Sequence, residues 1–193
     1  VEDGKVVDGV GGTMKGIGFL SSGEIDMEMI QLAGEWEKTD IFQGGIISMI
    51  QDDSIEGFLD NIDENEDYGY AWERMIEDIE KMVASLNVSV SDPNQILLSG
   101  RLSRFEKVES TLMERLGGYG PVSKINSESG AEKTKEAAQG YGIIAEGLAG
   151  GYFSDLVENM EIKKAEGTSL DYIRHPTGKR AVQEMKKDVP FRP

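Results

Sequence analysis

The 193-residue sequence contains no cysteine and only one histidine, His175. Disulfides, thiolate metal sites and a cysteine nucleophile are therefore excluded. A single histidine cannot supply the ligand set of an ordinary zinc site, and it leaves a histidine-based triad with one candidate base. The sequence also lacks any apolar run approaching the roughly 18 residues that indicate a membrane-spanning helix.

Positive charge is scarce as well. The chain has 20 Lys and Arg against 36 Asp and Glu, which gives a net charge of −16. So acidic a protein repels phosphate backbones and anionic lipids, which argues against nucleic-acid or membrane-surface binding as its main role. An anionic ligand would have to be held locally, by backbone N–H groups, a metal ion or a few basic side chains. Glycine, with 24 residues, is abundant and clusters in short turns beside apolar runs, where close backbone approach is favoured.

The first fifty residues predict short elements. Lys5–Asp8 and Met14–Leu20 read as two strands of a hairpin with a glycine-rich loop. Asp26–Ala33 is expected to be helical and to end at Gly34. The apolar run Ile41–Ile50 fits a short strand or a buried helix, and its periodicity does not decide between them.

An acidic segment and a long amphipathic helix follow. Residues 52–67 hold eight carboxylates and no basic residue, which is typical of a solvated loop or helix face. A calcium site is the alternative, but this segment lacks the glycine and terminal glutamate of an EF-hand loop. From Trp72 to Leu86, apolar residues recur three and four positions apart and predict one buried helical stripe. Trp72, Ile76, Ile79 and Val83 are its expected core residues.

The next segment alternates strand and helix. Gln95–Ser99 predicts a buried strand, Phe105–Leu116 a helix, Pro121–Ile125 a strand and Ala131–Gly150 a helix rich in Ala and Gly. This order favours a parallel strand pair with a right-handed crossover. Two capping boxes are expected at the helix starts, Ser103 with Glu106 and Ser129 with Glu132. The tail, residues 163–193, has eight basic and four acidic residues; we expect it to pair with the acidic body and to contain a last helix at Lys179–Lys187.

The run Asp8-Gly9-Val10-Gly11-Gly12-Thr13 is the first candidate site. A carboxylate at a strand end can hold Mg²⁺ directly or through water. The bare glycine backbone lets N–H groups approach anionic oxygens, and a threonine hydroxyl can donate to phosphate. A plain Asp-Gly hairpin turn remains the alternative.

The run Ile96-Leu97-Leu98-Ser99-Gly100-Arg101-Leu102-Ser103 is the second candidate site. A ligand commonly binds beyond the carboxyl end of such a strand. Gly100 leaves room for a flat base or ribose, and Arg101 and Arg104 suit stacking or phosphate contact, with surface ion pairs as the alternative. Glycines at 130 and 140 suit either a pocket wall or helix packing. Pro176-Thr177-Gly178-Lys179-Arg180 lacks the upstream glycine of a Walker motif.

Taken in order, DGVGGT, ILLSGRLSR and AAQGYGIIAEGLAGG resemble the C-terminal half of the archaeal predicted butyrate kinases. That family belongs to the superfamily of acetate kinase, sugar kinases, heat-shock protein 70 and actin. The resemblance covers roughly residues 5–150. It implies an α/β fold of the actin-like, ribonuclease H-like kind, a mixed sheet with helices on both faces. DGVGGT would be the second phosphate segment, ILLSGRLSR the adenosine segment, with Arg101 in place of the usual second glycine, and the third motif the connecting helix.

The resemblance implies an ATP-dependent kinase that uses Mg²⁺ and transfers phosphate between ATP and a short-chain carboxylate or other small molecule. Asp8 would hold the metal, with Gly9, Gly11, Gly12 and Thr13 at the phosphates. Ser99, Gly100, Arg101 and Arg104 would line the adenosine end. Lys15 is a candidate for the positively charged group that would bind a carboxylate substrate. The alternative function is an actin-like ATP-binding switch or assembly protein without metabolite kinase activity.

The same resemblance sets the expected organisation. Residues 1–162 would form the C-terminal nucleotide-binding domain, and residues 163–193 a basic extension packed on it. The first phosphate hairpin would belong to an N-terminal domain, so we expect a longer cytoplasmic protein, a chain inactive on its own, and a possible homodimer.

Overall fold

The computed structural model describes residues 1–12, 16–37, 39–50, 54–127, 130–131, 133–165 and 169–188. The chain divides into two compact units, Val1–Gly142 and Ile143–Pro193. The architecture is α/β, with a single two-stranded parallel sheet among the described residues and most of the remainder helical. The boundary expected at residue 162 falls inside the second unit, and the packing of the basic extension on the domain stays a prediction.

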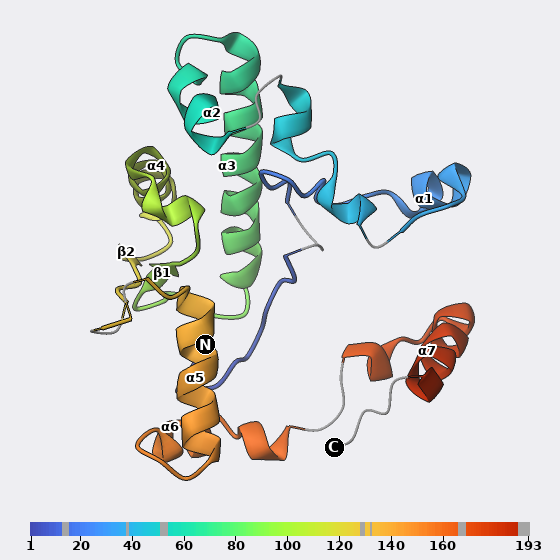
Figure 1. Ribbon diagram of the computed structural model, residues 1–193, viewed down its shortest axis with the longest axis vertical. Helices are drawn as coiled ribbons and strands as arrows, with labels where there is room; N and C mark the ends of the chain where they lie inside the picture. Colours follow the sequence, from blue (N-terminus) through green and yellow to red (C-terminus); the bar gives the residue numbers. More distant parts are fainter. Residues whose placement is uncertain are drawn as a thin grey trace. The chain divides into compact units, whose positions relative to one another are not determined.

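Helix α3 (Glu66–Leu86) organises the first unit (Figure 1). Asn65 caps its start, because the Asn65 side chain accepts a hydrogen bond from the Asp67 N–H. The predicted stripe is confirmed at Trp72 and Ile76, which are 4 % and 0 % exposed. Ile79 and Val83 are partly buried and pack against the same core. The stripe is most deeply buried towards the first half of the helix.

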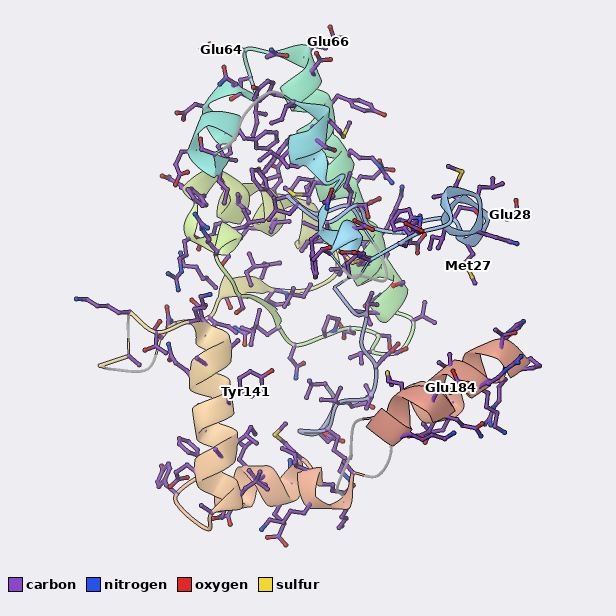
Figure 2. The ribbon with its side chains drawn as sticks, turned by 45° about the vertical axis from the view of Figure 1, so that its right-hand side comes forward. Met27, Glu28, Glu64, Glu66, Tyr141 and Glu184 are labelled. Atoms are coloured by element: carbon purple, nitrogen blue, oxygen red, sulfur yellow. The ribbon has the colours of Figure 1, made fainter. Side chains whose placement is uncertain are left out.

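The acidic segment leads into α2 (Ile55–Asn61), which Ser54 caps by accepting from the Gly57 N–H. Phe58 points inward, is 1 % exposed and packs edge-on to Phe19 and stacked on Tyr68. The described carboxylates of the segment are exposed. Figure 2 shows Glu64 and Glu66 at the turn between α2 and α3. The solvated-face interpretation is therefore confirmed for the described part of this segment.

Strands β1 (Ile96–Leu98) and β2 (Val122–Lys124) pair in parallel, with Leu97 opposite Ser123. Between them runs α4 (Glu106–Leu116), which packs on β2 and α3 (Figure 1). Its buried residues, at the predicted spacing, are Val108, Leu112 and Leu116. The predicted parallel unit is confirmed, but β1 is not buried throughout, because Leu97 is 53 % exposed. The mixed sheet implied by the resemblance is not formed among the described residues.

The hairpin predicted near the N-terminus is wrong for the described residues. Residues 5–8 and 16–20 form no strand ladder, and the nearest bridge joins Glu2 to Lys5. Residues 16–20 bond instead to the segment around Gly45. The N–H groups of Gly45 and Ile46 donate to the carbonyls of Leu20 and Gly18, respectively, both at 3.0 Å. These backbone partners replace the ones that a hairpin would have supplied.

Helix α1 (Met27–Ala33) confirms the prediction for this segment, with Asp26 as its N-cap and Gly34 after its last residue. No residue of α1 is buried, and Met27 and Glu28 project from it (Figure 2). The ambiguous run Ile41–Ile50 forms two short 3-10 helices, η1 (Asp40–Phe42) and η2 (Ile46–Met49). Ile46 is fully buried and anchors η2.

The capping box expected at Ser103 is wrong. Ser103 lies in the 3-10 helix η3 (Leu102–Arg104), and its hydroxyl donates to the Gly100 carbonyl at 2.8 Å. The N-cap of α4 is Phe105, which has no side-chain capping bond. The Ser103 hydroxyl, which was expected to cap α4, therefore bonds within the turn that precedes the helix. The box expected at Ser129 and Glu132 lies outside the described residues.

The Ala- and Gly-rich helix is α5 (Glu136–Leu148), and Tyr141 projects from it (Figure 2). Close packing at a glycine is found at Gly147, where a Cβ would lie 2.5 Å from the Phe153 carbonyl oxygen. Gly140 and Gly142 face open space. The second unit continues with α6 (Ser154–Asn159), η4 (Ile162–Lys164), η5 (Ser169–Tyr172) and α7 (Pro176–Asp188). Helix α7 confirms the predicted last helix. None of the described helices has the length and apolarity needed to cross a membrane.

Candidate functional site

Asp8 is exposed, and both of its carboxylate oxygens accept hydrogen bonds. The N–H of Gly9 donates to Asp8 Oδ1 at 2.7 Å, and the hydroxyl of Ser89 donates to Asp8 Oδ2 at 2.5 Å. Ser89 follows the end of α3, so the contact fixes the N-terminal segment against that helix end. The carboxylate is oriented yet open to solvent, as a metal-binding or ligand-binding group must be.

The glycines after Asp8 have no evident role in the described fold. A Cβ added at Gly9 or Gly12 would meet nothing within 4 Å, and neither residue has the positive φ that favours glycine. Gly11 is exposed and also has no positive φ. Thr13 and Lys15 lie outside the described residues. Bare backbone at Gly11 and Gly12 lets an anion approach closely, whereas the N–H of Gly9 already donates to Asp8 Oδ1.

A groove of about 450 Å³ lies beside Asp8. Its walls are mostly apolar and come from the end of α3, the following loop and β1: Val83, Leu86, Asn87, Val90, Pro93, Gln95, Ile96 and Leu97. Val1 and Asp8 complete the lining from the N-terminal segment, and Asp8 is its one charged side chain among the described residues. A concave apolar surface with few polar groups is typical of small-molecule sites.

The second candidate group lies at the carboxyl end of β1. Gly100 has a φ of 104° and open space at its Cβ position, so the turn requires glycine while the space beside it stays free. Ser99 and Arg101 are exposed. Arg104 Nη2 pairs with Glu136 Oε1 at 2.9 Å. Hydrogen bonding from its own backbone N–H, and then from Arg104, lowers the pKa of Glu136. Arg104 therefore makes the ion pair that was the alternative to a ligand contact.

The two candidate groups share no residue in the lining of the groove beside Asp8. The groove beside Asp8 is lined by Gln95, Ile96 and Leu97 of the β1 region, and its lining does not include Ser99, Gly100, Arg101 or Arg104. The roles assigned to these residues thus stay predictions.

Sequence reasoning missed two polar residues, of which Ser89 contacts the site and Asp78 lies elsewhere on α3. Ser89 holds Asp8, but an isolated serine after a helix carries no signal of that role. Asp78 is buried on α3 and accepts hydrogen bonds from Ile17 N at 2.8 Å and Arg74 Nη1 at 2.5 Å. A carboxylate inside the otherwise apolar α3 stripe, with arginine four residues earlier, could have indicated such a buried anchor.

The described residues contain no cluster of three or more His, Cys, Asp or Glu side chains that could hold a metal ion. A metal bound at Asp8 would therefore have at most two such side-chain ligands from the described part of the chain. Mg²⁺ tolerates such a site, because it keeps several waters and binds through one or two carboxylates together with phosphate oxygens.

The fold and the site define an α/β protein with an oriented surface carboxylate next to an open glycine segment. The chain belongs to the family described as "Protein of unknown function (DUF1464)", which it matches over residues 1–175. Comparison with curated proteins finds no match.

Among solved structures, the chain is similar to a propionate kinase from Francisella tularensis subsp. tularensis SCHU S4. The TM-score is 0.48 and the sequence identity 12%, over 59% of this chain and 38% of that chain. The chain thus spans well under two thirds of that kinase's length. The likeness is partial, and it defines no site.

Proposed function

We propose that this chain supplies the nucleotide-binding half of an ATP-dependent small-molecule kinase of the acetate and butyrate kinase type, built on the actin-like fold. The observation that carries the proposal is the segment after Asp8. An oriented carboxylate is followed by Gly9 and Gly12, which neither backbone conformation nor packing requires in the described fold, and by Gly11, which has no positive φ. A requirement for close approach by a phosphate would explain glycine at Gly9, Gly11 and Gly12.

Asp8 would hold Mg²⁺ or one of its coordinated waters. The donor set fits, because one exposed carboxylate leaves the remaining positions to water and nucleotide oxygens. Bound there, the metal would neutralise charge on the phosphates. The hydrogen bond from Ser89 positions Asp8 Oδ2, and the one from Gly9 positions Oδ1.

The adenosine end would lie at the carboxyl end of β1. Gly100 leaves open space beside the backbone there, and Ser99 and Arg101 are exposed. Arg104 would have to leave Glu136 in order to contact a phosphate. The acceptor would be a short-chain carboxylate or another small molecule, and the remaining contacts would come from a second domain in the full-length protein.

The test is Asp8→Asn in the full-length protein. The amide keeps the shape of the side chain and removes its charge. Because phosphoryl transfer depends on neutralising charge at the moving group, turnover should fall by roughly 10²-fold or more. Mg-ATP affinity should fall less, since the contacts near Gly100 remain.

Turnover is measured with candidate carboxylates, and Mg-ATP affinity by calorimetry. Asp3→Asn is the matched control, because Asp3 is an exposed aspartate of the same segment with a positive φ of 49° that asparagine also adopts. Unchanged turnover in Asp8→Asn would reduce the segment to a plain turn. ATP hydrolysis without phosphorylation of any acceptor would favour the ATP-binding switch instead.

A further inference from the structure

Asp78 is a buried carboxylate on α3 that has partners at both of its oxygens. Its Oδ2 accepts a hydrogen bond from the Ile17 N–H at 2.8 Å, and its Oδ1 accepts one from Arg74 Nη1 at 2.5 Å. Lys81 Nζ lies 3.9 Å from the same Oδ1. Burying a carboxylate is costly even when it is paired, and apolar residues often replace a buried ion pair without loss of stability. Stability alone therefore does not explain an aspartate at this position.

The backbone that Asp78 binds is closely packed. Gly16 has a φ of 74°, and a Cβ there would lie 3.0 Å from Met82 Cε and 3.3 Å from Asp78 Cβ. A Cβ on Gly23 would lie 2.6 Å from the Gly16 carbonyl carbon and 2.7 Å from Ile17 N. The peptide group between Gly16 and Ile17 is thus held by α3, by Gly23 and by the hydrogen bond to Asp78.

This peptide group follows shortly after the glycines of the candidate site. Before the segment 9–12, the Ser89 hydroxyl, just beyond the end of α3, donates to Asp8 Oδ2. After it, Asp78 near the middle of α3 accepts from the Ile17 N–H. The glycine segment is therefore flanked on both sides by hydrogen bonds to the α3 region. Fixing the two ends of a short segment removes part of its conformational freedom before any ligand binds.

We propose that Asp78 is a positioning residue for the phosphate site: by fixing Ile17, it holds the glycine segment 9–12 in the arrangement that receives the nucleotide phosphates. This inference rests on the proposed function. Asp78 acts through the backbone of Gly16 and Ile17 rather than by contact with the nucleotide. Its loss would weaken the contacts of the segment in the ground state and in the transition state alike, so the KM for Mg-ATP should rise while kcat changes little. Asp8→Asn should do the reverse and lower turnover more than affinity.

The kinetic test compares Asp78→Asn and Asp78→Ala in the full-length protein. The amide keeps an oxygen that can accept from Ile17 but loses the charge that binds Arg74, whereas alanine loses both. We expect the KM for Mg-ATP to rise roughly 3-fold in Asp78→Asn and roughly 10-fold in Asp78→Ala, the scale of a hydrogen bond to a charged group. The kcat should stay within about 2-fold of the parent value.

Two control variants separate positioning from general effects of substitution. Glu77→Gln is the charge control, because the exposed Glu77 pairs with Lys81 on the same helix at 2.8 Å. Val108→Ala is the stability control, because Val108 is buried in the same core but lies on α4. Both control variants should keep the KM of the parent for Mg-ATP at temperatures where they remain folded.

A second measurement needs no nucleotide. Trypsin cleaves after lysine, and Lys15 directly precedes Gly16. Cleavage of a folded protein requires the chain around the bond to open locally. Release of Ile17 should therefore speed cleavage after Lys15, followed by mass spectrometry, roughly 10-fold in Asp78→Ala and less in Asp78→Asn. The cleavage rate should not change in Glu77→Gln or Val108→Ala.

The two measurements distinguish failure of this inference from failure of the proposed function. An unchanged KM for Mg-ATP in an active Asp78→Ala enzyme, or the same rise in Val108→Ala, would overturn the positioning role. If the parent protein shows neither turnover nor Mg-ATP binding, the proposed function fails, and the cleavage rate alone decides whether Asp78 holds the segment. Unchanged cleavage after Lys15 in Asp78→Ala would then overturn that as well.

Discussion

At the residue scale, the glycines separate into those that the fold requires and those that it does not. Gly23 has a φ of 77°, and a Cβ there would lie 2.6 Å from the Gly16 carbonyl carbon. At Gly45 a Cβ would lie 2.4 Å from the Leu20 carbonyl carbon. Gly9 and Gly12 have neither a positive φ nor a close neighbour at the Cβ position. Substitutions at these two kinds of position should therefore separate folding from function.

Gly12→Ala should leave the midpoint of urea unfolding unchanged or raise it slightly, because alanine reduces the freedom of the unfolded chain by about 0.4–1 kcal/mol where its conformation fits. The same change should weaken Mg-ATP binding in the full-length protein, since a methyl group would block close approach of the phosphates. Gly23→Ala should behave oppositely and lower the unfolding midpoint. A clear loss of stability in Gly12→Ala would mean that its glycine serves the fold.

Single residues also show where sequence reasoning worked. Asp26 and Gly34 bound α1 as expected, because their signals are local. The serine at 103 failed as a cap because its hydroxyl turns back to Gly100. The hydrogen bond between Asp8 and Ser89 joins residues 81 positions apart in sequence, so only the fold could reveal it.

At the element scale, periodic segments were predictable and short ones were not. Helices α3 and α4 follow from apolar spacing, and the parallel pair follows from the order of elements. The N-terminal hairpin failed because strand formation depends on a partner, and Gly16–Leu20 found its partners in Gly45 and η2 instead. The run around Ile46 was ambiguous for the same reason: its structure is set by contacts distant in sequence.

Ile76→Ala tests the α3 core. Ile76 is fully buried, so its truncation should lower the free energy of unfolding by about 2–5 kcal/mol, measured by urea denaturation. Ile79→Ala should cost less, because Ile79 is partly exposed. Glu77→Ala, on the exposed face between them, is the control and should change stability little. Equal effects at all three positions would show that the α3 stripe is not the core.

The carboxylate of Glu136, which accepts from its own backbone N–H and from Arg104, should contribute a pH-dependent part of stability. Since the folded protein lowers the pKa of Glu136, the contribution is present above the ordinary glutamate pKa and is lost as the pH falls through the folded value. Glu136→Gln should therefore narrow the difference between unfolding midpoints at about pH 6 and about pH 3. Arg104→Gln should narrow that difference less, because the backbone hydrogen bond to Glu136 remains, and adding it to Glu136→Gln should change nothing further. The same difference between the two midpoints in the parent and in Glu136→Gln would show that the fold does not favour the charged form of Glu136.

At the scale of the whole molecule, charge governs what can bind. A net charge of −16 repels a nucleotide triphosphate at long range, so binding must rely on local N–H groups and a metal ion. A nucleotide site on so acidic a protein is therefore better explained by a metal-binding carboxylate beside exposed backbone N–H groups than by a pocket of basic side chains. It also makes the salt dependence of binding informative, because long-range repulsion and local attraction respond to screening in opposite directions.

Affinity for ATP in the full-length protein should require Mg²⁺ and should not fall as salt rises. Chelation would remove the proposed metal bridge between Asp8 and the phosphates, so ATP alone should bind at least 10-fold more weakly than Mg-ATP. Raising NaCl from about 20 mM to about 200 mM shortens the screening length and weakens the repulsion, so Mg-ATP affinity should hold or rise about 2-fold. Calorimetric titrations at both salt concentrations, with and without EDTA, provide the measurement. A steep loss of affinity with salt would instead indicate that local cations such as Arg101 and Arg104 dominate binding, and it would move the main contact from Asp8 to the carboxyl end of β1.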